Sequence, residues 1–278
     1  MSARTAESND PHWSAVAHHW QEYGPPLRPS PADIAAMEQS VRSWPGRPVV
    51  RGLRALLLGV TPEIAAMAWP DDAHLTAIDR SEAMIEHVWP GDIAGRRTVR
   101  QADWFACDYG SNDIVICDGV FAIMRYPDQY VALVRKIATS LAEGGFFVTR
   151  TFLQAVVRET PANVLRDLVD GKIGSVHAFK FRLAMSMQPS AAEGVRHADV
   201  FDAAQKGGID CDTLSARTGW SEIEIDTLRL YRDKDTRLSF PTASEMASVM
   251  AEHFETIGES RSDYEMGDRC PVLTYRRR

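Results

Sequence analysis

The stretch that decides the fold is Arg54-Ala55-Leu56-Leu57-Leu58-Gly59-Val60-Thr61-Pro62-Glu63. After Arg54, four residues form an apolar run that is too short for a helix and fits a strand buried on both faces of a sheet. Gly59 ends this run, and Thr61 followed by Pro62 is typical of a helix N-cap with proline at the first helical position. A buried strand that turns through glycine into a helix predicts the opening of a parallel α/β sheet.

The same alternation continues along the chain. Short apolar runs predict further strands, and amphipathic stretches between them predict helices. Strands alternating with helices are typical of a doubly wound, mostly parallel sheet with right-handed crossovers. We expect strands at 75–79, 98–101, 113–118, 146–150, 254–259 and 270–276, and helices at 31–44, 62–69, 81–88, 130–141 and 243–253.

Acidic residues follow three successive strands of this pattern. Asp79 ends the second strand, Asp103 follows the third, and Asp118 ends the fourth. In an open parallel sheet, ligands bind beyond the carboxyl ends of the strands, so these carboxylates are expected at one edge. Asp79 lies about 20 residues after the glycine turn, where a carboxylate accepts hydrogen bonds from ribose hydroxyls. The alternative is that each acid only caps a helix or a turn.

Residues 50–152 and the two closing strands resemble the class I S-adenosylmethionine-dependent methyltransferases. The resemblance rests on the glycine turn at Gly59, on the three acids, on Asp118-Gly119-Val120-Phe121, and on the turn Gly144-Gly145 before the fifth strand. It implies an α/β fold: a seven-stranded Rossmann-like sheet, mostly parallel with the last strand antiparallel, carrying N-terminal helices and a helical insertion. It implies S-adenosyl-L-methionine as cofactor and S-adenosyl-L-homocysteine as product.

The resemblance also implies a set of cofactor-binding residues. Asp79 would bind the ribose, Asp103 would accept from the adenine amino group, and Trp104 or Met84 would cover the ring. Asp118 and Gly119 would lie at the methionine end. The full set is Gly59, Thr61, Glu63, Asp79, Arg80, Met84, Asp103, Trp104, Asp118, Gly119 and Phe121.

The glycine turn departs from the family pattern. Leu57 stands where the family often has an acid, and Thr61 and Glu63 stand where it has two further glycines. The backbone cradle that a dinucleotide's phosphates need is therefore missing, and Glu63 would repel phosphate. A ligand with a sulfonium and an ammonium group suits these acidic surroundings better.

The sequence divides into four segments. We expect an N-terminal tail and lid helices at 1–48, a cofactor-binding core at 49–152, a helical insertion at 153–240, and a closing helix and hairpin at 241–278. Because the core supplies the cofactor site, acceptor choice is expected to come from the N-terminal helices and the insertion. The insertion could equally form the interface of a homodimer.

Candidates for acceptor binding and catalysis are weaker. Tyr23, Phe179, Arg182 and Tyr231 combine aromatic and basic groups, which suits a small, partly apolar, anionic acceptor. Lys180 and Arg182 are otherwise expected to lie in solvent. The general base stays unidentified, and its candidates are His18, His19, Tyr126 and His177.

Composition excludes several classes of function. The chain of 278 residues has a formal net charge of −7, which argues against a nucleic-acid binder. No apolar run approaches the length of a membrane helix, and the N-terminus lacks the apolar core of a signal peptide. Four cysteines without metal-ligand spacing predict free thiols in the cytoplasm and no metal site.

The sequence therefore predicts a class I enzyme that transfers a methyl group from S-adenosylmethionine to a small-molecule acceptor. Three alternatives stay open. The first is an intramolecular cyclase or lyase that releases methylthioadenosine, and the second is a nicotinamide-dependent oxidoreductase, which the missing glycines disfavour. The third is a non-catalytic ligand-binding protein with this fold.

Overall fold

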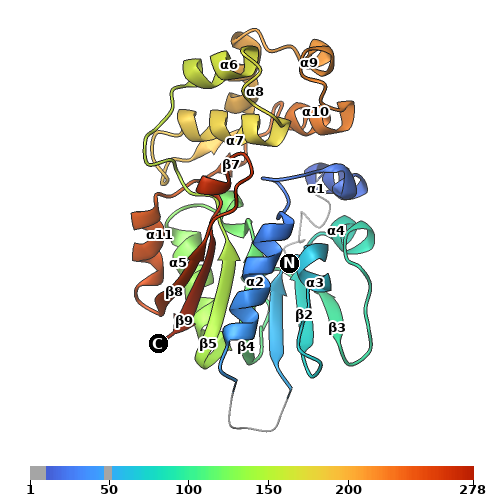
Figure 1. Cartoon of the computed structure of the whole chain (residues 1–278), viewed down its shortest axis with the longest axis vertical. Coiled ribbons are helices and arrows are strands. Elements are labelled where there is room, and N and C mark those ends of the chain that lie inside the picture. The colour runs from blue at the N-terminus through green and yellow to red at the C-terminus, as the bar shows by residue number, and fades with distance from the viewer. Residues whose placement is uncertain (1–10, 47–51) are drawn as a thin grey trace, which may run out of the picture.

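The computed structural model describes residues 11–46 and 52–278 (Figure 1). Most of the predicted N-terminal tail lies outside these residues. The helices are α1 (Pro11–His18), α2 (Pro31–Ser43), α3 (Pro62–Ala66), α4 (Glu82–His87), α5 (Asp128–Ser140), α6 (Pro161–Val169), α7 (Val176–Met187), α8 (His197–Lys206), α9 (Cys211–Thr218), α10 (Glu222–Arg229) and α11 (Ala243–Met250), with short 3₁₀ turns η1 (Trp20–Glu22), η2 (Val120–Ile123) and η3 (Gly267–Arg269). The strands are β1 (Arg54–Leu58), β2 (His74–Asp79), β3 (Arg97–Gln101), β4 (Asn112–Asp118), β5 (Leu141–Arg150), β6 (Val195–Arg196), β7 (Arg237–Leu238), β8 (Phe254–Ser260) and β9 (Val272–Arg277).

Seven strands form one sheet in the order β3-β2-β1-β4-β5-β9-β8. The neighbours from β3 to β5 pair in parallel, whereas β9 is antiparallel to both β5 and β8. The predicted fold class, with its antiparallel last strand, is confirmed. A dinucleotide-binding sheet has the order 3-2-1-4-5-6 without this inserted antiparallel strand.

Alternate residues of the central strands face two separate cores, as a strand's period of two requires. Leu56 and Leu58 of β1 pack with α5 and α11 on one face, and Leu57 packs with α2, α3 and α4 on the other. The central strands therefore read as continuous apolar runs because both of their faces are covered.

Helices α6 to α10 and the two-stranded ribbon β6–β7 form a lobe above the carboxyl ends of the parallel strands (Figure 1). The lobe has its own core, in which Phe179, Leu183 and Phe240 are fully buried. The ribbon was not predicted, because its strands are only two residues long. Helix α1 lies between the lobe and the sheet (Figure 1).

The helix starts follow local chemistry. Ser30 caps α2 in a reciprocal capping box with Asp33. Thr61 stands at the N-cap of α3 without a side-chain cap bond, and α3 ends at Ala66, earlier than the predicted Trp69.

All four cysteines are free thiols. Within 11–46 and 52–278, no helix has both the length and the apolar character of a membrane span.

Candidate functional site

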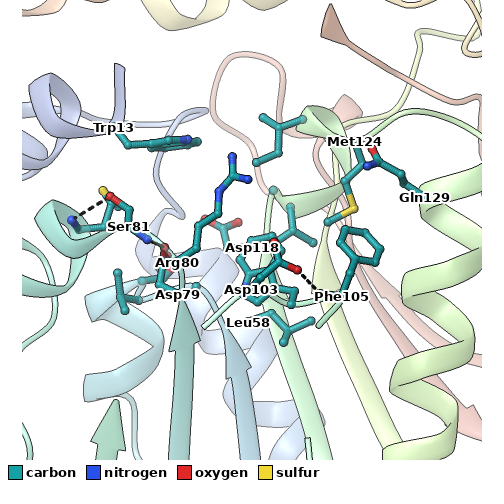
Figure 2. Close-up of a pocket in the computed structure, with 18 of the residues that line it drawn as sticks. Trp13, Leu58, Asp79, Arg80, Ser81, Asp103, Phe105, Asp118, Met124 and Gln129 are labelled. Atoms are coloured by element: carbon teal, nitrogen blue, oxygen red, sulfur yellow. Dashed lines mark hydrogen bonds between the residues drawn. The ribbon is translucent and has the colours of Figure 1, made fainter. Parts of the chain in front are cut away.

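A cavity of about 320 Å³ opens beyond the carboxyl ends of β1, β2 and β4 (Figure 2). Trp13 of α1 lies above the strand ends, and Arg80 rises from the end of β2 toward it (Figure 2). The cavity is lined by Trp13, Trp20, Leu58, Gly59, Val60, Thr61, Asp79, Arg80, Ser81, Met84, Asp103, Trp104, Phe105, Asp118, Gly119, Val120, Ile123, Met124 and Gln129. The three acids predicted from strand ends therefore meet in one cavity.

One backbone carbonyl positions two parts of this cavity. The oxygen of Ile78, near the end of β2, accepts from the Gly59 amide at 2.8 Å and from the Trp104 indole nitrogen at 2.7 Å. Gly59 has φ +98°, which side-chain-bearing residues rarely adopt, while no atom would obstruct a Cβ within 4 Å. Glycine is thus needed here for backbone conformation, which turns the chain sharply from β1 toward α3.

Asp79 is held at the floor of the cavity. Its Oδ1 accepts a hydrogen bond from the Ser81 amide at 2.8 Å, which fixes the carboxylate at the turn into α4. Burial raises the pKa of Asp79 to about 6, because the charged form loses hydration. A ligand that donates hydrogen bonds would replace that lost hydration.

Asp103 and Trp104 form a second fixed pair of side chains. Asp103 Oδ1 accepts from the amides of Phe105 at 2.7 Å and Ala106 at 3.1 Å. These bonds set the turn after β3, and the bond to Ile78 sets the plane of the indole beside it. The arrangement offers a carboxylate edge next to an aromatic face, which suits a planar heterocycle with an amino group.

Asp118 is bound by a buried arginine, Arg150, whose role could not be predicted from the sequence. Arg150 donates to Asp118 Oδ1 from Nε at 2.5 Å and to Oδ2 from Nη2 at 3.1 Å. Burial lowers the pKa of Arg150, but the neighbouring Asp118 carboxylate more than offsets this effect, and its pKa is raised overall. Arg150 therefore stays charged at the end of β5.

Arg150 also binds the segment between α1 and α2. Its Nη1 donates to the Pro26 carbonyl at 2.9 Å and to the Tyr264 hydroxyl at 3.0 Å. It thus joins β4, β5, the N-terminal segment and the loop between β8 and β9 around one charge. The sequence around Arg150 predicts only the end of a strand and does not indicate these partners, which are distant along the chain.

A second cavity of about 180 Å³ adjoins the first and reaches into the lobe. Trp13, Trp20, Thr61, Arg80, Asp118, Gly119 and Ile123 line both cavities. The other lining residues are His12, Val16, Leu27, Ala122, Phe152, Lys180, Phe181, His197, Thr227, Tyr231, Lys234, Thr236, Arg237 and Leu238. The two cavities therefore lie directly beside each other and share one wall.

Comparison with solved structures identifies the architecture. An N-methyltransferase, NodS from Bradyrhizobium japonicum, solved with S-adenosyl-L-homocysteine, matches with a TM-score of 0.51 at 11% identity, over 97% of this chain and 99% of that one. A SAM-dependent methyltransferase from Methanosarcina mazei matches with a TM-score of 0.50 at 12% identity, over 90% and 99%. Both neighbours and the inserted antiparallel strand indicate the same fold. This chain has the class I methyltransferase fold.

A further neighbour carries a different name. A putative Zn-dependent alcohol dehydrogenase from Rhodobacter sphaeroides matches with a TM-score of 0.62 at 13% identity, over the whole of both chains. Such identity establishes fold alone. In the described part of this chain, no group of three or more His, Cys, Asp or Glu side chains could hold a metal ion. No protein-family model and no curated protein sequence matches the chain.

Two residues predicted to bind cofactor lie elsewhere in this methyltransferase fold. Glu63 does not line the main cavity, because its Oε1 accepts from Arg28 Nε at 2.7 Å. Phe121 is fully buried, with its ring centroid 4.9 Å from that of Tyr130, and belongs to a core of the sheet. The other nine predicted residues line the cavity.

Most predicted acceptor contacts also lie elsewhere. Tyr231 lines the second cavity, whereas Tyr23, Phe179 and Arg182 line neither cavity. Phe179 is fully buried in the core of the lobe. Arg182 is held by Asp167 at 2.6 Å and by Glu159, and Tyr23 packs edge-on against His177 at 5.3 Å.

None of the four candidate bases lines either cavity. The centroid of the His18 ring lies 4.2 Å from that of the tilted His87 ring, His19 Nδ1 lies 2.8 Å from Glu22, and Tyr126 packs on Tyr130. His177 is fully buried, and burial lowers its pKa well below the usual value.

Proposed function

We propose that the protein transfers the methyl group of S-adenosylmethionine to a small-molecule acceptor. The observation that carries the proposal is the pair of adjoining cavities at the carboxyl edge of a methyltransferase sheet. The larger cavity has an acidic lining and no glycine-rich phosphate cradle. The neighbour solved with S-adenosyl-L-homocysteine supports this assignment.

The residues of the larger cavity fit the parts of this cofactor. Asp79 would accept hydrogen bonds from the ribose, and Asp103 with Trp104 and Met84 would enclose the adenine. Asp118, Gly119, Thr61 and Gly59 would surround the amino-acid end. When bound, the cofactor supplies an electrophilic methyl group on a sulfonium centre.

The protein would contribute to the reaction by positioning the acceptor against the cofactor and by excluding water. The wall shared by the two cavities would hold the acceptor beside the cofactor, whose methyl group would pass to the acceptor as its bond to sulfur breaks. Effective molarity gains of this kind reach about 10⁵ M and more in well-oriented systems. Trp13 and Trp20 of the N-terminal segment line both cavities and would exclude water from the wall.

A product assay tests the proposal. The enzyme is incubated with trideuteromethyl S-adenosylmethionine and panels of small nucleophiles, and products are analysed by mass spectrometry. Methyl transfer predicts S-adenosyl-L-homocysteine together with a deuteromethylated acceptor. Release of methylthioadenosine would instead identify an intramolecular cyclase or lyase, and tight cofactor binding without turnover would identify a non-catalytic binding protein.

A further inference from the structure

Lys180 of α7 lies in the wall of the second cavity as a buried cation. Its side chain is 3% exposed, although the sequence predicted it in solvent. Its Nζ donates to Thr227 Oγ1 at 2.7 Å and to the Thr227 carbonyl at 3.4 Å, and it lies 5.0 Å from the centre of the Tyr231 ring. These partners are neutral, and no carboxylate of the described residues lies within 4.0 Å of Nζ.

The rest of this cavity does not supply the missing negative charge. Arg80 and Arg237 also line it, and Asp118 is the only carboxylate among its described lining residues. Both oxygens of Asp118 accept hydrogen bonds from Arg150. Among the described lining residues, Lys180, Arg80 and Arg237 therefore outnumber the carboxylates left without an arginine partner.

Aromatic rings form much of the remaining wall. Trp13, Trp20, Phe152, Phe181 and Tyr231 all line the cavity. Aromatic faces with a few polar groups favour a flat apolar molecule whose orientation is fixed by one charged end.

We propose that the second cavity binds an acceptor with an aromatic frame and an anionic oxygen, a carboxylate or a phenolate, and that this oxygen pairs with Lys180. This inference rests on the proposed function only in naming the bound molecule as the acceptor. Burying an ammonium group among neutral partners costs several kcal/mol unless a counter-charge arrives. If Lys180 had only a structural role, its replacement by methionine would leave the binding of anionic molecules unchanged. If Lys180 binds an anion, the same replacement would weaken that binding.

The charge state of Lys180 gives a second readout. Burial lowers the pKa of Lys180 to about 7, so both forms are populated near neutral pH. A bound carboxylate stabilises the ammonium form, so affinity should be highest below pH 7 and fall above it. In the part of the chain that the structure describes, the titratable and charged groups around Lys180 and its cavity are His12, His177, His197, Tyr231, Lys234, Arg80, Arg237 and Asp118.

The test uses benzoate and cinnamate with their neutral amides as probes, and calorimetry on the full chain. Wild type should bind the acids roughly tenfold or more tightly than the amides, as a charge-assisted bond implies. Lys180→Met should abolish this preference while its melting temperature stays equal or rises. Lys172→Met is the matched control, since Lys172 lies exposed in the same lobe and should leave the preference unchanged.

Amides that bind as tightly as the acids, acids that bind Lys180→Met like wild type, or acids that do not bind at all would each overturn the inference. If Lys180→Met does not fold, the wild-type series decides, because affinity for benzoate that does not fall above pH 7 contradicts the proposal. S-adenosyl-L-homocysteine is titrated in parallel. If S-adenosyl-L-homocysteine binds but the acids bind no more tightly than their amides, only this inference fails. If the acids bind through Lys180 but S-adenosyl-L-homocysteine does not bind, only the proposed cofactor fails.

Discussion

The charged carboxylate of Asp79 should destabilise the ligand-free protein and stabilise its complex with the cofactor. Because its folded pKa, about 6, exceeds the unfolded value, the folded state holds the proton more tightly. Stability therefore falls as pH rises between about 4 and 6 and stays reduced above that range. Asp79→Asn, which keeps an oxygen for the Ser81 amide, should leave the free energy of unfolding unchanged or raise it by up to about 3 kcal/mol.

The same substitution should weaken S-adenosyl-L-homocysteine binding by roughly tenfold or more, since hydrogen bonds to a charged acceptor contribute about 1.5–3 kcal/mol. Urea unfolding and calorimetry measure the two effects separately. A large loss of stability with affinity retained would identify Asp79 as a structural cap.

Protonation of Asp79 should cause the same loss of affinity in the wild-type protein. As pH falls through about 6, the carboxyl group loses charge and accepts hydrogen bonds less strongly. Affinity for S-adenosyl-L-homocysteine is expected to fall over this window, and Asp79→Asn should flatten the profile between pH 5 and 7, apart from groups on the ligand. A decline of equal size in the variant would assign the titration to another group.

Arg150 should be a main determinant of stability. Arg150→Met leaves the buried Asp118 carboxylate without its partner, and breaking such a pair costs about 3–5 kcal/mol. Urea unfolding should show a loss of this size. Adding Asp118→Leu should restore part of it, because the uncompensated charge is then gone. Near-wild-type stability of Arg150→Met would contradict this interpretation.

At the scale of elements, α1 is expected to cover both cavities. Trp13 lines each of them, and α1 packs on α4 beside the end of β2. Trp13→Ala should raise the Kd for S-adenosyl-L-homocysteine about tenfold, through lost apolar contact. Trp44→Ala, at the far end of α2, is the control, because Trp44 lines neither cavity. Equal affinities of the two variants would exclude a covering role.

Helix α7 illustrates what sequence cannot predict. Phe179, Lys180, Phe181 and Arg182 follow one another at steps of about 100° around the helix, so their mixture of types does not say which side faces a ligand. Tertiary packing turns Phe179 into the lobe core, Arg182 toward Glu159 and Asp167, and Lys180 toward the cavity. The helix itself was predictable from its apolar content, but its orientation was not.

At the scale of the molecule, the sheet and its acidic edge followed from local sequence. Apolar runs ending in Gly59, Asp79 and Asp118 must bring their ends together once the strands are parallel. The second cavity and the Arg150 network were beyond local sequence, because each joins segments more than a hundred residues apart, such as Arg150 and Pro26. The homodimer stays a prediction, and sedimentation velocity measures it.

The most direct test of the central claim is a calorimetric titration of the full chain with S-adenosyl-L-homocysteine and with NADH, both in EDTA. The account predicts one-site binding of S-adenosyl-L-homocysteine that needs no metal and weakens in Asp79→Asn, together with no measurable binding of NADH. Binding of NADH in place of S-adenosyl-L-homocysteine would contradict it.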